Sequence, residues 1–310
     1  MQFYYEMATS LKGNWANAKG VLHHVELGPD PFIWKTLGDE LVFVKTITDP
    51  RQVPVALSVF QTALIEFRDI QNDQRLEMAR LGIHLQARGA AWLAGFPVTN
   101  SEVILKHTQD LKDLDAAASW SFQNTVALTD WYSGENIDGD SQPPTGLIRD
   151  FIGPSIDTGF RLAAFSTPRE IVISPEVAWW IAESERCYRT DKKLTFPELY
   201  FGGTRKLTGV LDGVPYPIYW LDAMKDEPLA NAENAVTGRK SVDMRNVGDH
   251  IKAFVERYKA LHLPFLNGAE HIFGEKPDWV DAKIQEMISA FERDHREYEQ
   301  MQRFRANSGV

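Results

Sequence analysis

The chain has 310 residues, of which 44% are hydrophobic and 25% charged, and this length can bury a substantial core in one large domain or two ordinary ones. The formal net charge of -10 argues against a nucleic-acid-binding protein that depends on a broad basic surface, but is compatible with a small phosphorylated substrate. The single cysteine, Cys187, excludes an intramolecular disulfide framework and favours the cytoplasm, and no signal peptide or run of 18 apolar residues points to a membrane.

The N-terminal segment predicts a strand, a helix and a hairpin. Residues 2–8 are rich in aromatic residues and predict a strand, which runs into a helix capped near Thr9 or Ser10. Two apolar runs then flank Gly38 and Asp39. This pattern predicts a hairpin with its turn at that pair, so the carboxylate of Asp39 is expected at a strand tip.

The middle of the chain predicts further elements and an insertion. Apolar residues at helical spacing predict a helix from residue 50 to about residue 70, and residues 80–98 predict two strands around Arg88 and Gly89. Residues 105–148 are polar and rich in Gly, Asp and Pro in their second half. We expect a long insertion there, with a mobile second half.

The stretch DFIGPSIDTGFRLA, residues 150–163, places two carboxylates and a guanidinium among glycines and apolar residues. A helix is expected to begin near Ser155. On that helix Asp157 and Arg161 are four residues apart, which also fits a simple exposed ion pair. Spacing alone therefore leaves a structural and a functional interpretation open.

The rest of the chain predicts a short strand before a helix that begins near Ser174, and a closing hairpin over residues 201–221. From about residue 222 the composition is helical and charged, with two apolar stripes. The stripes are Ile251, Phe254, Val255 and Tyr258, and Ile284, Met287, Ile288 and Phe291. The whole order predicts an α+β fold with a mainly antiparallel sheet, helices on one face and a ferredoxin-like core.

Four segments, YYEMATS, KTLGDE, DFIGPSIDTGFR and TRKLTG, together resemble the catalytic domain of class III nucleotidyl cyclases in their order and spacing. The resemblance covers roughly residues 3–221. It implies a cyclase catalytic domain over residues 1–221, with the insertion at about 105–148, and a C-terminal helical extension over residues 222–310.

The resemblance implies a reaction with two divalent cations, Mg²⁺ or Mn²⁺, in which the ribose 3′-hydroxyl attacks the α-phosphate of a nucleoside triphosphate. Carboxylates from adjacent strands suit such hard cations. Asp39 matches one family ligand. The other falls on Glu6, where the family has an aspartate; the alternative is an exposed glutamate at a strand end.

The remaining family positions map onto five residues. Lys35 and Asp150 match the pair that selects the base, and their hydrogen-bonding capacity suits adenine, uracil or cytosine more than guanine. Asp157 takes the place of the ribose-orienting asparagine, and Arg161 that of the arginine that stabilises the transferring phosphoryl group. Lys206 matches the lysine that binds the terminal phosphates; Arg205 is adjacent to it, and either residue also fits a solvated strand position. Both partners of the Lys35–Asp150 pair also fit a surface ion pair.

The resemblance implies a homodimer with two composite active sites, and no regulatory domain is expected before the first segment. Among relatives of this type, it is similar to the stand-alone bacterial antiphage pyrimidine cyclases, which make cyclic UMP or cyclic CMP. UTP is the first expected substrate and CTP the second. Two alternatives stay open: an adenylate cyclase, or a degenerate homologue that binds nucleotide without turnover.

Overall fold

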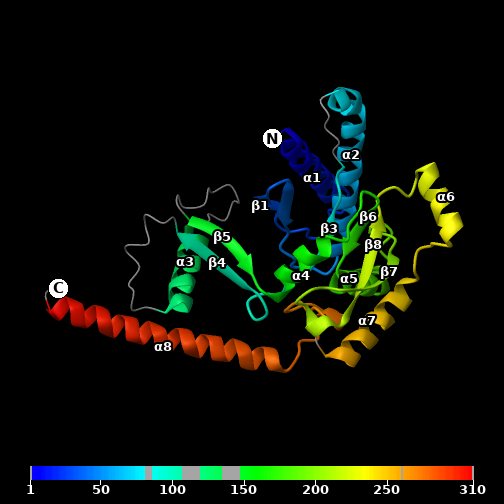
Figure 1. Ribbon diagram of the computed structural model, residues 1–310. Coiled ribbons are helices and arrows are strands. Elements are labelled where there is room, and N and C mark those ends of the chain that lie inside the picture. The colour runs from blue at the N-terminus through cyan, green and yellow to red at the C-terminus, as the bar shows by residue number, and fades with distance from the viewer. Residues whose placement is uncertain (1, 81–85, 107–118, 135–146, 260, 309–310) are drawn as a thin grey trace. The chain divides into compact units, whose positions relative to one another are not determined.

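The computed structural model describes residues 2–80, 86–106, 119–134, 147–259 and 261–308 of the chain. The chain forms two compact units. Unit 1 combines Met1–Ala94 with Pro154–Glu275, and unit 2 combines Gly95–Gly153 with Lys276–Val310. Each unit contains both helices and strands (Figure 1). The predicted α+β class is therefore confirmed.

The central sheet of unit 1 has four strands in the order β3-β6-β8-β7. Strand β3 runs parallel to β6, whereas β6 and β7 are both antiparallel to β8. The strands are β3 (Ala90–Ala91), β6 (Glu170–Ile173), β7 (Tyr200–Lys206) and β8 (Pro215–Asp222). The predicted closing hairpin is thus confirmed as β7 and β8. The described strands form three separate sheets rather than one, so the ferredoxin-like core stays a prediction.

The described α-helices of unit 1 pack around this sheet. They are α1 (Gln2–Val21), α2 (Gln52–Arg80), α4 (Pro154–Ala163), α5 (Pro175–Tyr188), α6 (Pro228–Thr237) and α7 (Met244–Tyr258). Two short 3₁₀ helices, η2 (Leu211–Gly213) and η3 (His271–Gly274), complete the unit. Residues 81–85 lie outside the described residues, and with them part of the two strands predicted around Gly89.

The sheet is covered on both faces. Successive side chains of a strand point to opposite faces. On β6, Ile171 and Ile173 pack in one cluster with α2 and α5, while Val172 packs in a second cluster with Leu162 of α4. The expectation that helices cover only one face is therefore wrong, because α4 closes the other.

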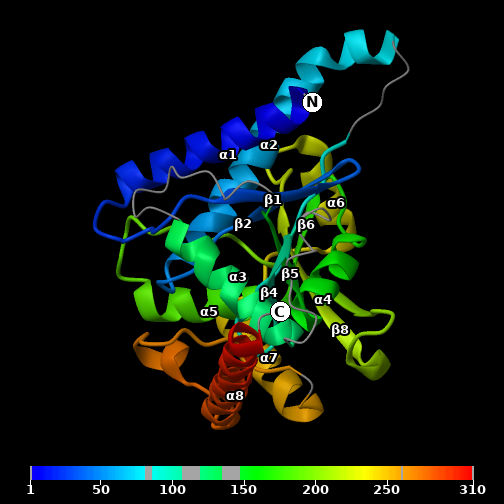
Figure 2. The same cartoon turned by 90° about the vertical axis from the view of Figure 1, so that its left-hand side faces the viewer.

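The strand predicted over residues 2–8 is also wrong, since this segment opens helix α1. The reason is visible in the packing. Phe3, Met7, Leu11 and Trp15 recur every four residues, and the last three are buried. The Phe3 ring packs edge-on against Phe67 of α2, 6.0 Å between centroids, and α1 lies alongside α2 in both views (Figure 1, Figure 2). A helical stripe that buries three large side chains outweighs the strand preference of the tyrosines.

Three local predictions are confirmed. Strands β1 (Phe32–Leu37) and β2 (Glu40–Val44) form a hairpin whose turn is Gly38 and Asp39, with Gly38 at φ 63°. Helix α4 begins at Pro154. Helix α5 begins after Ser174, whose hydroxyl oxygen accepts from the Val177 N–H. Each signal is local, because a turn or a cap is decided by a few adjacent residues.

The boundary predicted near residue 221 does not coincide with the division of the chain, because unit 1 continues to Glu275. On α7, Val247 and Ile251 are buried in the same cluster as Trp179 of α5. Lys252 Nζ donates to Glu183 Oε1 at 2.8 Å, which joins the same two helices. The apolar stripe of α7 needs a partner surface, and α5 supplies it.

Unit 2 contains a strand pair and two helices. Strand β4 (Ser101–Lys106) pairs antiparallel with β5 (Leu147–Ile152), helix α3 is Trp120–Gly134 and helix α8 is Trp279–Ser308. Helix α3, which the sequence did not predict, packs Trp131 against Ile104. The remainder of the predicted insertion, 107–118 and 135–146, lies outside the described residues. No helix in the described part of the chain is long and apolar enough to cross a membrane.

Candidate functional site

Asp157 and Arg161 form a two-bond ion pair on α4. Arg161 Nε donates to Asp157 Oδ2 at 2.8 Å, and Nη2 donates to Oδ1 at 3.1 Å. The side chains are 53% and 38% exposed. The hydrogen bonds to Asp157 raise the pKa of Arg161. A permanently charged guanidinium is thus held at the surface, open to solvent and to a ligand.

Arg161 also lies against the connection that follows β7. Gly209 in this connection has a φ of 72°, and a Cβ built there would lie 3.7 Å from Arg161 Nη2. Lys206 is the last residue of β7, three residues before Gly209. The structure therefore brings Arg161 beside the segment that follows Lys206.

The strand register separates Lys206 from its neighbour Arg205. Residues paired across two antiparallel strands point to the same face. Arg205 pairs with Tyr216, and Tyr216 packs in the cluster that contains Leu162 of α4. Lys206 pairs with Pro215, one position along, and so points to the opposite face. Arg205, the neighbour of the predicted Lys206, is therefore the basic residue on the strand face that α4 covers.

The β1–β2 hairpin contacts α4 through aromatic rings. Trp34 and Phe160 lie with their ring centroids 6.0 Å apart. Lys35 Nζ lies 4.0 Å from the Trp34 ring centroid and 5.9 Å from that of Phe160. Lys35 is thus placed next to the helix that carries Asp157 and Arg161, and its ammonium is attracted to both ring faces.

Asp39 and Glu6 do not share a strand edge. Asp39 is exposed at the hairpin turn, and Tyr4 of α1 donates its hydroxyl hydrogen to the Gly38 carbonyl oxygen at 2.5 Å. Residues two positions apart in a helix, such as Tyr4 and Glu6, are separated by about 200° around its axis. Glu6 therefore faces away from the side of α1 on which Tyr4 contacts the hairpin. Among the described residues, no three His, Cys, Asp or Glu side chains form a group that could hold a metal ion. Asp39 is positioned to be one ligand of a metal ion. The arrangement does not support a metal site that Asp39 shares with Glu6.

Asp150 belongs to unit 2, whereas Lys35 belongs to unit 1. Asp150 lies on β5 opposite Val103, and its Oδ1 accepts from the Phe151 N–H at 2.9 Å. The pairing of Asp150 with Lys35 at a nucleobase stays a prediction.

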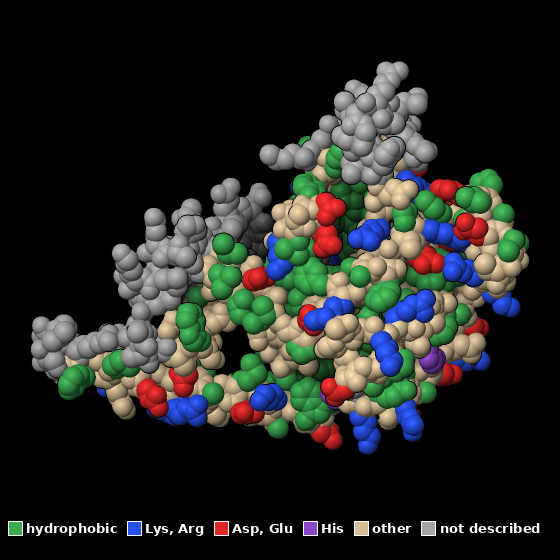
Figure 3. All heavy atoms as spheres, viewed as in Figure 1, with side chains coloured by type: hydrophobic (Ala, Val, Ile, Leu, Met, Phe, Trp, Pro, Cys, Tyr) green, Lys and Arg blue, Asp and Glu red, His purple; other side chains and the backbone are tan. Residues whose placement is uncertain are grey.

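Lys35 thus lies beside α4, which carries Asp157 and Arg161, and Arg205 is on the strand face that α4 covers. Comparison of the chain with protein-family models, with curated proteins and with solved structures finds no match. Basic and acidic side chains are interspersed over unit 1 on the face seen in Figure 3. The charge of the site therefore comes from these few residues and not from a broad basic surface.

A partly buried acid that the sequence did not single out, Glu176, lies next to Tyr216, the strand partner of Arg205. Tyr216, the strand partner of Arg205, donates its hydroxyl hydrogen to Glu176 Oε2 at 3.3 Å. Burial raises the pKa of Glu176 and, together with the nearby Glu176 carboxyl, raises that of Tyr216. The only signal in the sequence is a Glu in the first turn of α5, which is ordinary for a helix N-terminus.

Proposed function

We propose that the chain is a nucleotide cyclase that converts a nucleoside triphosphate to a 3′,5′-cyclic nucleoside monophosphate and pyrophosphate. The observation that carries this proposal is the contact between Trp34 and Phe160. It joins the hairpin of Lys35 and Asp39 to the helix of Asp157 and Arg161. These segments are the ones that resemble class III cyclases, in the same order.

In the proposed reaction the ribose 3′-oxygen forms a bond to the α-phosphorus, and the bond between that phosphorus and the bridging oxygen to the β-phosphate breaks. The proton of the 3′-hydroxyl passes to solvent, and pyrophosphate leaves. Asp157 accepts a hydrogen bond from the ribose, and Arg161 donates to the phosphoryl oxygens on which charge develops. Its planar fork suits two such oxygens. Arg161 must exchange at least one bond to Asp157 for one to the nucleotide.

Divalent cations, Mg²⁺ or Mn²⁺, would neutralise triphosphate charge in this reaction, and Asp39 is the described carboxylate that fits as a ligand. Arg205 would bind the terminal phosphates, the role that the resemblance gives to its neighbour Lys206. Arg205 has the better position, because its strand partner Tyr216 packs on the face of α4.

For the base we propose uracil first, cytosine second and adenine third. Lys35 supplies a hydrogen-bond donor, and the Trp34 and Phe160 rings crowd its ammonium. Bulky rings beside the donor favour a single-ring base. By resemblance, the product is an antiphage signal made in the cytoplasm by a homodimer with composite sites, in which Asp150 contacts the base.

The test is an incubation of the purified chain with each of the four nucleoside triphosphates and Mn²⁺. Pyrophosphate release and the mass of the cyclic product are measured together. We expect cyclic UMP, with less cyclic CMP. Asp39→Ala is expected to abolish the product while leaving the circular dichroism spectrum unchanged, and Lys12→Ala, an exposed substitution on α1, is the control. No cyclic product from any triphosphate would overturn the proposal, and a preference for ATP would overturn only the base assignment.

The second candidate is a cyclase homologue that binds nucleotide without turnover. The position of Glu6 on a helix, turned away from the hairpin that carries Asp39, favours it over a complete two-metal site. Calorimetry separates the two candidates. The homologue without turnover should bind a triphosphate saturably and release no pyrophosphate, and Arg161→Ala should weaken this binding.

A further inference from the structure

Lys45, the residue after β2, places its amine against the protein without an acid bonded to it. The residue is only partly exposed, and its Nζ lies 5.2 Å from the ring centroid of the fully buried Trp15 on α1. Among the described residues its one hydrogen bond goes to the Thr46 carbonyl oxygen, at 2.5 Å. The Asp30 carboxylate, which acts on Lys45 through its charge, is bonded instead to Lys19 Nζ at 2.5 Å. The Lys45 ammonium is therefore held by a neutral group.

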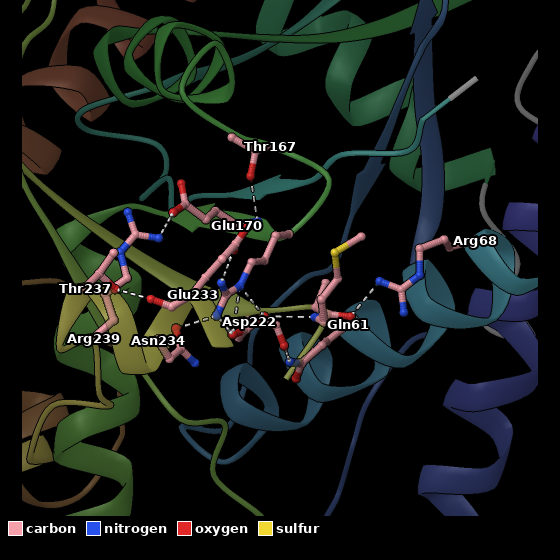
Figure 4. A network of polar contacts seen from close by, with 12 residues as sticks. Gln61, Arg68, Thr167, Glu170, Asp222, Glu233, Asn234, Thr237 and Arg239 are labelled. Carbon is pink, nitrogen blue, oxygen red and sulfur yellow. Dashed lines mark hydrogen bonds and ion pairs between the residues drawn. The ribbon is translucent and has the colours of Figure 1, made fainter. Parts of the chain in front are cut away.

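Arg169 shows how unit 1 accommodates another buried cation. Its Nη2 donates to Asp222 Oδ2 and its Nη1 to Glu233 Oε2 of α6, each at 2.7 Å (Figure 4). Two carboxylates thus replace the water that the guanidinium loses. A charge that loses water and gains no acid is disfavoured in its charged form. Lys45 is in that position, which suits it to react as a neutral amine.

Burial weakens the binding of the proton to Lys45. Loss of water and the charge of Lys19 lower its pKa from 10.5 to about 8, although the Asp30 charge acts in the opposite direction. The face of the Trp15 ring also favours the ammonium, so burial is the larger effect. Near neutral pH a substantial share of Lys45 is therefore the free amine, which is the nucleophilic form of lysine.

The surroundings of this amine are fixed, and they are open on one side. A Cβ at Gly28 would lie 3.5 Å from Lys45 Nζ and 3.4 Å from Thr48 Oγ1, so both polar groups face the bare side of this glycine. The buried Gln52 side chain donates from Nε2 to Thr48 Oγ1 at 2.9 Å. Because Thr48 Oγ1 accepts this bond, its own hydroxyl hydrogen can be donated to a new carbonyl oxygen. Thr46 and Thr48 are exposed, so a small reagent can reach the amine from this side.

We propose that Lys45 is a site of covalent acylation by a small acyl phosphate, the mixed anhydride of a short carboxylic acid and phosphate. The Nζ lone pair forms a bond to the acyl carbon, and the bond between that carbon and the phosphate oxygen breaks. Inorganic phosphate leaves with the electron pair, and the proton that Nζ loses passes to solvent. The product is a neutral amide, which no longer carries the charge that burial disfavours. Its N–H can keep the bond to the Thr46 carbonyl oxygen.

The charges around Lys45 suit an anionic reagent. Lys19 and Lys45 bring two amines against one carboxylate, that of Asp30, so a phosphate group is not repelled by a surplus of acids. The partial burial of Lys45 favours a short acyl group over a long one. Acetyl phosphate is therefore the probe of choice.

The test uses the full chain without nucleotide, so its result does not depend on the proposed cyclase activity. The chain is incubated with acetyl phosphate at pH 7.5, and peptide mass spectrometry gives the initial rate of acetylation at each lysine. Lys45 is expected to react about tenfold or more faster than Lys12, which is exposed on α1. Its larger share of free amine outweighs the lower nucleophilicity of a less basic group. A Lys45 rate no higher than that of Lys12 overturns the proposal.

Two further measurements connect the reactivity to the folded cluster. In the folded chain the Lys45 rate should level off above about pH 8, whereas in concentrated urea it should keep rising toward pH 10. Lys19→Met should slow acetylation of Lys45 at pH 7.5, because it removes a charge that lowers the Lys45 pKa and frees Asp30. Lys12→Met is the matched control and should leave the rate unchanged. Identical pH profiles in the two states, or an unchanged rate in Lys19→Met, would refute the role of this cluster.

The product can be tested directly by placing Nε-acetyllysine at position 45 during synthesis of the chain. At pH 7 this change should raise the thermal unfolding midpoint, because it removes an ammonium that burial disfavours. The gain should shrink toward pH 10, where folded Lys45 has already lost its proton. Nε-acetyllysine at position 12 is the control and should change little at either pH. A lower midpoint for the position 45 product at pH 7 would mean that the acyl group does not fit, and the proposal would fail.

Discussion

The indole ring of Trp92 lies so close to Gly159 that a Cβ at position 159 would stand 2.1 Å from Trp92 Cδ2 and 2.2 Å from Cε2. Trp92 follows β3 directly, and Gly159 lies in the middle of α4. The Phe160 ring also packs on Trp92, with centroids 5.4 Å apart. Helix α4 can therefore approach the end of β3 only because residue 159 has no side chain, and this approach positions Asp157 and Arg161.

Gly159→Ala should destabilise unit 1 by about 1–3 kcal/mol, the usual cost of overpacking, although alanine is the better helix former. Gly13→Ala is the matched control. Nothing lies within 4 Å of a Cβ at position 13 of α1, so this change should stabilise the chain by about 0.5–1 kcal/mol. Urea denaturation followed by tryptophan fluorescence measures both. Equal stability of the two variants would contradict the close approach of Trp92.

Ile251→Ala should destabilise unit 1 by about 2–5 kcal/mol, the range for an aliphatic side chain removed from a packed core. Ile251 on α7 is 1% exposed and packs with α5. Ile288→Ala on α8 removes the same atoms from a residue that is 44% exposed, and should cost about 1 kcal/mol or less. If Ile251→Ala were as mild as Ile288→Ala, the packing of α7 on α5 would contribute little to the stability of unit 1.

The elements that were predicted correctly depend on local signals. The turn of the β1–β2 hairpin needs only Gly38 and Asp39 between two apolar runs, and α5 needs only Ser174 before a proline. The prediction of a strand over residues 2–8 failed because the tyrosines near Phe3 favour a strand. The four-residue spacing of Met7 and Leu11, which indicates a helix, extends beyond residue 8. The spacing was the better signal.

The parts of the site that escaped prediction depend on contacts between distant segments. Whether Arg205 or Lys206 faces α4 is fixed by the pairing of β7 with β8, and a one-residue shift in register would exchange them. The inward polar face of α6 likewise depends on Arg169, which is distant in sequence. The sequence predicts the apolar stripe on α7, but the spacing of apolar residues does not indicate that α5 is the helix against which it packs.

Lys45 should make the stability of unit 1 depend on pH above neutrality. Burial, and the nearby Lys19, lower its pKa from 10.5 to about 8, and its Nζ lies 5.2 Å from the ring centroid of Trp15. Between these two values the unfolded chain binds the proton that the folded chain has lost, so the free energy of unfolding rises with pH. Below about pH 8 both states are protonated and this contribution stops changing.

The measurement is the difference in unfolding free energy between the wild type and Lys45→Met at pH 7.5 and at pH 10. The wild type should gain stability relative to the variant as the pH rises. Lys12→Met, at an exposed position of α1, corrects for general effects of removing a charge. A difference that is constant across this range, or that falls, would show that Lys45 is not held in a desolvated position.

Arg161→Ala should lower turnover of the preferred triphosphate by about 100-fold or more, the scale for losing one preorganised donor to a developing oxyanion. Arg161→Lys should restore little of it, because an ammonium lacks the planar fork. Both side chains of the Asp157–Arg161 pair are largely exposed, so the thermal unfolding midpoint should stay the same in each variant. Asp157→Asn should keep most of the turnover, since an amide oxygen still accepts a hydrogen bond from the ribose and no longer competes as a charge for Arg161. Steady-state kinetics separates kcat from KM in all three variants. If Arg161→Ala changes only KM, Arg161 is a binding residue only. If Asp157→Asn lowers turnover as much as Arg161→Ala does, the intact ion pair is the active form.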